Sequence, residues 1–377
     1  MFDSPAWWMY IIGFPLLLGP LVTVHELGHY LVGRWFGVHA EAFSVGFGKE
    51  IAGFTDKRGT RWKLSALPLG GYVQFKGDMN PASVPDAEAE PEEGAFQAAS
   101  LWKRALIVAA GPVTNLIVAI AILAAFFAIL GKPTVVDAVA STQIGAFSDD
   151  SVAKAAGLEI GDQITKVDQT PIADFNDLVE NIALYPDKRV TLEVVRDGNT
   201  MTFPVTIARI ENDDGFGNKG DIGRIGVGPA ALQYEWQPVP LLDTVPLATA
   251  QCWKLVKMMV TGIQQIITGQ RSIKELGGPI KIAKVSGERL SLGPTAFIEF
   301  VALISLNLAF INFLPIPALD GGHLAFYAIE AVRRKPVGPQ ATEWAYRTGI
   351  ALVLAFMVVV TFNDVTSLPL IGGLFGS

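Results

Sequence analysis

The strongest constraint on this chain is an uncharged stretch from Pro5 to Val24 that leads directly into the run His25-Glu26-Leu-Gly-His29. A stretch of this length and composition can cross the hydrocarbon core of a bilayer as a helix. In an HExxH run on a helix, both histidines lie on one face and the glutamate lies beside a metal-bound water. Because polar groups at membrane depth are costly, they usually serve a function. The N-terminus therefore predicts a metal-binding helix inside or at the edge of a membrane.

The composition indicates a polytopic α-helical membrane protein. Half of the 377 residues are hydrophobic and 17% are charged, which is too apolar for an ordinary soluble enzyme. The first basic residue is Arg34 and no small-residue cleavage site follows the apolar run, so we expect the first segment to stay attached. The net charge of −7 argues against nucleic acid as a partner.

Four transmembrane helices, a membrane-associated β-sheet and one inserted β-sandwich domain are predicted. The expected segments are a first transmembrane helix with HExxH (1–35), a cytoplasmic-side β-sheet (36–77), an acidic linker with a basic helix start (78–104), a second transmembrane helix (105–130), an outer domain (131–240), an amphipathic interfacial helix and loop (241–294), a third transmembrane helix (295–324), a cytoplasmic loop (325–347), and a fourth transmembrane helix with the tail (348–377). The stretch 247–267 is apolar but carries Lys254 and Lys257. We interpret it as lying on the outer membrane face rather than as a fifth crossing.

The distribution of charge predicts the orientation. The loop from Arg34 to Arg104 holds nine Lys or Arg residues, and the segment from Arg333 to Arg347 holds four more. Both belong in the cytoplasm by the positive-inside rule. Between residues 131 and 243 there are 18 acidic and 9 basic residues, which fits a translocated domain. The N- and C-termini are therefore expected on the outer side of the membrane.

The outer domain carries the pattern AGLxxGDxIxxVxxxPI from Ala155 to Ile172. This pattern resembles the core of PDZ domains, and the resemblance implies a β-sandwich whose groove accepts an extended peptide by strand addition. A short helix is predicted from Phe175 to Leu184 by its apolar spacing. Peptides or exported proteins are the expected ligands.

A third metal ligand is expected from the segment Asn312-Phe-Leu-Pro-Ile-Pro-Ala-Leu-Asp320-Gly-Gly-His323. Asp320 is a carboxylate in an apolar run, and metal coordination would offset its cost there. His323 is the competing ligand, and a helix-capping role is the structural alternative for Asp320. His39 is expected to be a solvated loop residue.

Depth in the membrane supports the choice of Asp320. The first and third spans are expected to run in the same direction, with His29 five residues before Arg34 and Asp320 thirteen before Arg333. At about 1.5 Å per helical residue, both reach the cytoplasmic part of the membrane. The two asparagines allow two interpretations each: Asn115 and Asn312 could pack between helices or contact the substrate.

Together, HELGH, GPVTN, one PDZ-like insertion and NFLPIPALDGGH resemble the site-2 family of intramembrane zinc metalloproteases over nearly the whole chain. The resemblance implies Zn²⁺ as cofactor, His25, His29 and Asp320 as its ligands, Glu26 as general base and Asn312 as a contact to the substrate backbone. It also implies that the sheet from residue 43 to 75 re-enters the membrane and holds the substrate as an added strand. Family members with two tandem PDZ domains exist, whereas this chain has room for one.

We therefore expect a zinc endopeptidase that cuts single-span membrane proteins inside the bilayer. Anti-sigma factors of an envelope stress response are the expected substrates, with leftover signal peptides as a further group. The alternative is a non-catalytic membrane adaptor with a PDZ-like domain and a vestigial metal site, although an intact Glu26 argues against it. A transporter is disfavoured because the spans show no inverted repeat.

Overall fold

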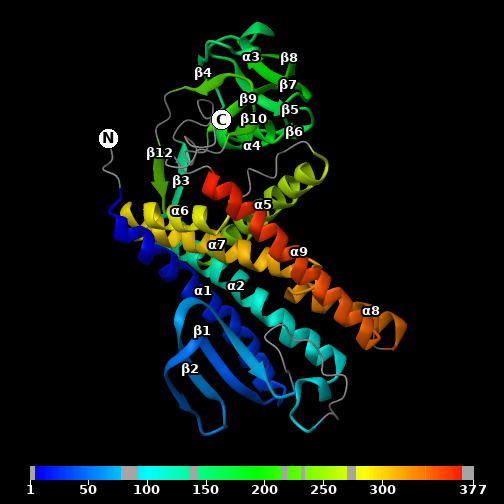
Figure 1. Cartoon of the computed structure of the whole chain (residues 1–377). Coiled ribbons are helices and arrows are strands. Elements are labelled where there is room, and N and C mark those ends of the chain that lie inside the picture. Colours follow the sequence, from blue (N-terminus) through cyan, green and yellow to red (C-terminus); the bar gives the residue numbers. More distant parts are fainter. Residues whose placement is uncertain are drawn as a thin grey trace. The chain divides into compact units, whose positions relative to one another are not determined.

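The computed structural model describes residues 5–77, 92–135, 142–213, 219–230, 234–269, 277–335 and 337–366 (Figure 1). The chain falls into two units. The first comprises residues 1–124, 248–252 and 277–365, and the second comprises 125–247, 253–276 and 366–377. The first unit contains most of the long apolar helices and a β-hairpin, and the second contains the inserted β domain.

Within the described residues, four helices are long and apolar enough to cross a membrane. They are α1 (Trp7–Trp35), α2 (Leu101–Leu130), α7 (Pro294–Phe313) and α9 (Pro339–Thr366). The prediction of four spanning segments is confirmed. The helix α5 (Leu241–Ile267) is not among them, in agreement with the prediction that 247–267 does not cross. The fourth helix begins before the predicted residue 348.

The predicted third span, 295–324, is two helices rather than one. Helix α7 ends at Phe313, and a separate helix, α8 (Asp320–Arg333), begins after six intervening residues. Pro315 and Pro317 lie between them, and proline lacks the N–H that a continuing helix needs. The intervening loop is closed by a hydrogen bond from the Leu319 N–H to the Ile316 carbonyl, 3.0 Å long. The LDG motif thus lies at the start of α8 rather than inside the spanning helix.

A β-hairpin follows α1, as expected for 36–77. It consists of β1 (Ala40–Thr55) and β2 (Arg61–Phe75), which Asp56 joins by accepting hydrogen bonds from the N–H groups of Arg58 and Thr60. Residues 42–45 of β1 pair with 71–74 on one side and with 61–64 on the other. In the described part of the chain, no strand pairs with the other side of 71–75, so these residues form a free sheet edge.

Aromatic side chains attach this sheet to α1. Phe43 of β1 is buried, and its ring lies 5.7 Å from that of Tyr30 on α1 and 4.6 Å from that of Trp62 on β2. Aromatic pairs at such distances contribute beyond their buried area. The predicted membrane re-entry of the sheet stays a prediction. The acidic linker predicted within 78–104 lies largely outside the described residues; it ends in a short 3₁₀ helix, η1 (Phe96–Ala98).

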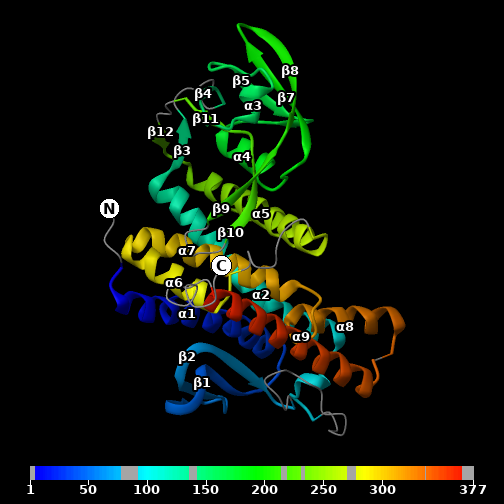
Figure 2. The same cartoon turned by 45° about the horizontal axis from the view of Figure 1, so that its top comes forward.

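The segment predicted as a loop before the third span contains another helix, α6 (Pro279–Ser291). Helix α6 lies along α1 in both views (Figures 1 and 2). The contact is close, since a Cβ placed on Gly13 of α1 would lie 3.0 Å from the backbone nitrogen of Gly287. The N-terminus of α6 is capped by Asp364 of α9, which accepts hydrogen bonds from the backbone N–H groups of Gly278 and Lys281.

The second unit is built from small antiparallel sheets. Its largest sheet has the order β6-β5-β7-β8. The strands and short helices are β3 (Lys132–Val135), β4 (Ile144–Phe147), α3 (Val152–Ala155), β5 (Gln163–Val167), β6 (Thr170–Pro171), α4 (Phe175–Ala183), β7 (Arg189–Arg196), β8 (Asn199–Thr206), β9 (Ala208–Asp213), β10 (Lys219–Arg224), β11 (Val227–Pro229) and β12 (Tyr234–Gln237). A single core forms around Ile164, Leu192 and Val194, which are fully buried. The helix predicted at 175–184 is confirmed, whereas the PDZ-like fold stays a prediction.

Helix α5 is anchored to the β domain by polar contacts. The Lys254 ammonium lies 3.0 Å from Asp177 and 3.1 Å from Glu180 on α4. On another side, α5 exposes large apolar side chains, namely Leu242, Val245, Trp253, Val260 and Ile267. These positions follow one stripe of the helix, as in an amphipathic helix. Its location on a membrane surface stays a prediction.

Candidate metal centre

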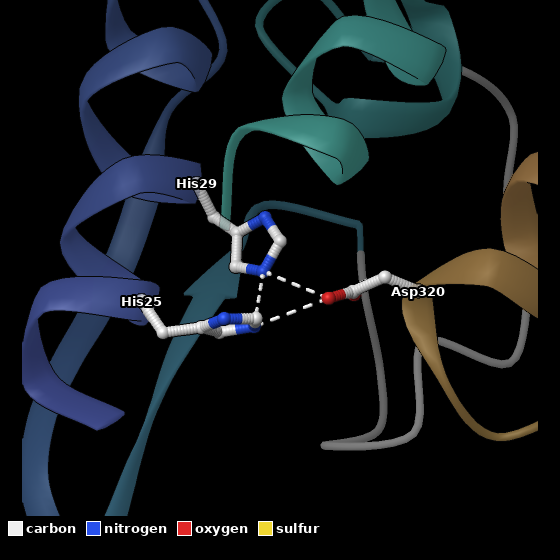
Figure 3. A group of neighbouring side chains, drawn as sticks. All are labelled: His25, His29 and Asp320. Carbon is white, nitrogen blue, oxygen red and sulfur yellow. Dashed lines mark hydrogen bonds and ion pairs between the residues drawn. The ribbon is translucent and has the colours of Figure 1, made fainter. Parts of the chain in front are cut away.

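Three potential ligand atoms converge between α1 and the start of α8 (Figure 3). His25 and His29 lie one helical turn apart on α1, with their Nε2 atoms 3.1 Å from each other. The Asp320 Oδ2 atom lies 3.1 Å from Nε2 of His25 and 3.6 Å from Nε2 of His29. Both histidines are buried. The structure thus brings together the three residues that the sequence predicted as ligands.

The separations fit a tetrahedral zinc ion. Ligand bonds of 2.0–2.2 Å in tetrahedral geometry place neighbouring ligand atoms roughly 3.3 Å apart, which lies within the range of the three distances. Two imidazoles and one carboxylate form a known donor set for catalytic zinc and leave one position open. The Asp320 Oδ2 atom is buried, and the described residues provide it with no hydrogen-bond donor. A buried carboxylate oxygen without a donor is costly, and a cation at this position removes the cost.

Glycine at position 111 allows α2 to approach the histidines. A Cβ placed on Gly111 would lie 2.3 Å from Nε2 of His29 and 2.7 Å from Nε2 of His25. On the opposite helix, a Cβ on Gly28 would lie 2.6 Å from the Ala110 carbonyl oxygen. Any larger residue at position 111 would therefore occupy the space of the ligand atoms. In the sequence, Gly111 stands out only as a glycine before a proline inside a spanning helix, within GPVTN.

The second nitrogen of each histidine has a partner on α2. Nδ1 of His29 lies 2.8 Å from the carbonyl oxygen of Ile107. Nδ1 of His25 lies 3.2 Å from the side-chain amide of Asn115. Asn115 is fully buried and does not line the cavity beside the site. The structure therefore places this candidate substrate contact behind the ligand His25.

The loop before α8 determines which residue of LDGGH reaches the histidines. A Cβ on Gly321 would lie 2.2 Å from the Leu314 carbonyl oxygen, and one on Gly322 would lie 2.4 Å from that of Ile316. The two glycines therefore let the loop fold over the start of the helix and direct Asp320 toward α1. The neighbouring His323 instead places Nδ1 2.5 Å from the Tyr346 hydroxyl on α9. Asp320, rather than His323 or His39, belongs to the ligand group.

A cavity of about 430 Å³ adjoins the three ligands. Glu26 lines it, and the Glu26 Oε2 atom accepts a 3.1 Å hydrogen bond from the backbone N–H of Val73 in β2. The free sheet edge lines the same cavity through residues 71–73, and Asn312, in the last turn of α7, lines it as well. The three candidate ligands, the Glu26 carboxylate and the free sheet edge thus border the same cavity.

Comparison with known proteins agrees with this arrangement. The model of peptidase family M50 matches residues 13–356. A Rhizobium meliloti protein named "putative zinc metalloprotease" is 42% identical over 360 residues, covering 93% of this chain and 95% of its own length. A protein of Agrobacterium fabrum with the same description is 41% identical over 369 residues, covering 95% and 96%. Metalloprotease MmpA of Caulobacter vibrioides is 34% identical over 397 residues, covering 97% and 98%.

The family match therefore includes α2 and α7 entirely, most of α1, the first part of α9, and both parts of the candidate metal centre. The predictions of a metalloprotease and of zinc as its cofactor are confirmed. The chain belongs to peptidase family M50 and is a zinc metalloprotease with several membrane-spanning helices.

Proposed function

We propose that this protein hydrolyses peptide bonds within the membrane-spanning segments of other proteins. His25, His29 and Asp320 would hold the zinc ion, and Glu26 would be the general base. The observation that supports this most directly is the shared cavity, in which the three ligand atoms, Glu26 and a free sheet edge lie together at helices long enough to cross a bilayer. A soluble substrate would not require that arrangement.

The chemistry divides between the ion and the side chains. Bound zinc polarises a carbonyl and lowers the pKa of a coordinated water to about 7. The Glu26 carboxylate is held through Oε2 by the Val73 N–H, which leaves Oε1 to accept the proton of the attacking water. Glu26 then returns this proton to the leaving amine nitrogen. General acid–base assistance of this kind typically contributes about 10²–10⁴-fold in rate.

A helical substrate must be extended before it can react, because its carbonyl groups are hydrogen-bonded within the helix. The edge at 71–75 can receive an extended strand. Since the Val73 N–H points to Glu26 in the cavity rather than to β1, the neighbouring outward-facing groups of this edge point in the same direction. Asn312 lies on the α7 wall and offers an amide that can both donate to and accept from a peptide group. We assign the substrate-holding role to these two elements.

The proposed substrates are single-span membrane proteins of the anti-sigma factor type, with remnant signal peptides as a second proposed group. The apolar cavity walls at Val22 and Leu308 suit an apolar segment. Exported polypeptides would bind the PDZ-like domain. The proposed location is the bacterial inner membrane, with both termini on the periplasmic side, on the basis of the charge distribution.

The function is tested with purified full-length protein in detergent and a fluorescent single-span substrate. Glu26→Gln should abolish cleavage while zinc content and protein level persist, and a chelator should abolish cleavage by the wild type until zinc is restored. Glu41→Gln, at an exposed position, is the matched control and should cleave normally. Retained cleavage by Glu26→Gln would refute the catalytic role, and a wild type that binds zinc and exported peptides without cleaving any span would favour the adaptor.

A further inference from the structure

We propose that Asn115 is a positioning residue that fixes His25 for zinc binding by accepting a hydrogen bond from the Nδ1–H of that histidine. The inference deepens the proposed function, because it rests on His25 as a ligand. It gives Asn115 a role different from the substrate contact expected from the sequence.

The location of Asn115 excludes direct contact with substrate in the arrangement observed. Its side chain is fully buried, and the cavity beside the metal centre is lined by other residues. Its amide nitrogen lies 3.2 Å from Nδ1 of His25, which is itself 7% exposed. The other amide atom, Oδ1, is buried without a hydrogen-bond partner. Asn115 therefore has one polar neighbour for its side-chain amide among the described residues, and that neighbour is the candidate ligand.

The chemistry of imidazole explains why this neighbour matters. A histidine that coordinates through Nε2 carries its proton on Nδ1, and this N–H needs an acceptor. A half-turn of the Asn115 amide exchanges its nitrogen and oxygen, so that Oδ1 faces Nδ1. The hydrogen bond then fixes the tautomer and the ring plane of His25. It also gives the otherwise orphaned amide oxygen its partner.

For His29, a backbone carbonyl provides the acceptor that Asn115 provides for His25. Its Nδ1 atom lies 2.8 Å from the Ile107 carbonyl oxygen, which can only accept. The two ligands on α1 are thus both oriented by α2, one by a carbonyl that no substitution removes and one by a side chain. This contrast makes Asn115 the position at which the orientation of a ligand can be altered by mutation.

A third helix holds Asn115 in place. The Ser305 hydroxyl of α7 donates a 2.7 Å hydrogen bond to the backbone carbonyl of Asn115, and Ser305 is fully buried. Water is scarce at membrane depth, so no other acceptor readily replaces a lost one. Simple helix packing would be served as well by an apolar side chain of similar size. The packing explanation therefore predicts a different response to mutation.

The test measures zinc affinity of the purified full-length protein by competition with a chromophoric chelator, together with the visible spectrum of the cobalt(II)-substituted protein. Asn115→Leu, which keeps the volume and removes the acceptor, should weaken zinc binding about 10–100-fold, as loss of an orienting partner typically does. Asn115→Asp keeps an acceptor and should remain within about threefold of the wild type. Both effects should appear in the cobalt bands, which report ligand geometry.

Thr114→Val is the matched control, because among the described residues the Thr114 hydroxyl donates its hydrogen bond to the Ala110 carbonyl within α2 and not to a candidate ligand. It should leave the zinc affinity and the cobalt spectrum unchanged. Folded Asn115→Leu with wild-type zinc affinity would overturn the inference, as would Asn115→Asp binding zinc as weakly as Asn115→Leu. If Asn115→Leu does not accumulate, Asn115→Ser, whose shorter side chain cannot reach His25, decides in its place. A wild type that binds no zinc would overturn the proposed function itself, so the two failures are distinct.

Discussion

Two carboxylates, one in each unit, have buried oxygens but differ in the hydrogen-bond donors around them. Asp162 in the β domain is 1% exposed and fully bonded: Arg196 donates to its two oxygens at 2.6 and 2.7 Å, and the Glu159 N–H donates at 2.9 Å. Asp320 in the first unit has a buried oxygen that is directed at two histidines and that receives no hydrogen bond from the described residues. A bonded carboxylate of the first kind stabilises a fold, whereas the second kind is arranged for a ligand.

The pKa of Asp162 shows that its hydrogen bonds outweigh the effect of its burial. Burial by itself would raise this pKa, yet the hydrogen bonds from Arg196 and from the Glu159 N–H hold it below its usual range. The charged form is therefore the native one. The comparison teaches that the depth of a carboxylate says little about its role, and that the donors around it decide.

Exchanging each carboxylate for an amide is the most severe test of this comparison. Asp320→Asn removes an anionic ligand, so zinc content should fall well below one per chain and cleavage should drop more than about a hundredfold, beyond the loss typical of orienting partners. Asp162→Asn should leave zinc content unchanged while the β domain loses about 2 kcal/mol of stability, the range for hydrogen bonds to charged groups. Metal analysis and hydrogen exchange measure the two. Equal zinc loss in both variants would contradict the distinction.

The next largest effect, a loss of zinc affinity, is expected from substitution of Gly111. It tests whether the space around the ligands is as tightly limited as the donors around Asp320. Gly111→Ala would place a methyl group where both Nε2 atoms lie, so zinc affinity should fall about tenfold or more, comparable to disturbing a ligand's support. Gly262→Ala on α5 is the control, because among the described residues nothing outside its own stretch of helix lies within 4 Å of a Cβ there. It should have no effect on zinc and should slightly favour the helix. Titration with zinc under competition decides, and normal affinity of Gly111→Ala would show that α2 can shift.

The smallest expected effect is a change in the stability of the β domain at acidic pH. Since the folded-state pKa of Asp162 lies below its unfolded value of about 3.9, its contribution to stability is complete above that pH and is lost as the pH falls through the folded pKa. Hydrogen exchange of the β domain, corrected for intrinsic rates, should show wild type and Asp162→Asn converging below about pH 4. A difference that stays constant from pH 6 to acid would mean that the charge of Asp162 contributes nothing.

Several features were predictable because they depend on local pattern. The spacing of His25 and His29 and the uncharged run before them follow from the periodicity of one helix. Pro315 and Pro317 before Asp320 indicate an end of the third spanning helix, although the predicted span, 295–324, continues past them. The helix α6 was missed because its residues are as polar as those of a loop. It is held by other helices, since its Gly287 packs closely against Gly13 of α1 and Asp364 of α9 caps its N-terminus.

The sequence by itself determined the types of the candidate ligands and the number of long apolar helices, and it predicted Glu26 as the general base, because these depend on residue identity and on short-range spacing. Only the tertiary structure decided that Asp320 rather than His323 joins the histidines, because loop closure over Gly321 and Gly322 sets which side chain faces α1. It also decided that Asn115 lies behind His25 rather than in the cavity. Contacts between helices distant in sequence leave no periodic trace, since they depend on how the helices approach one another.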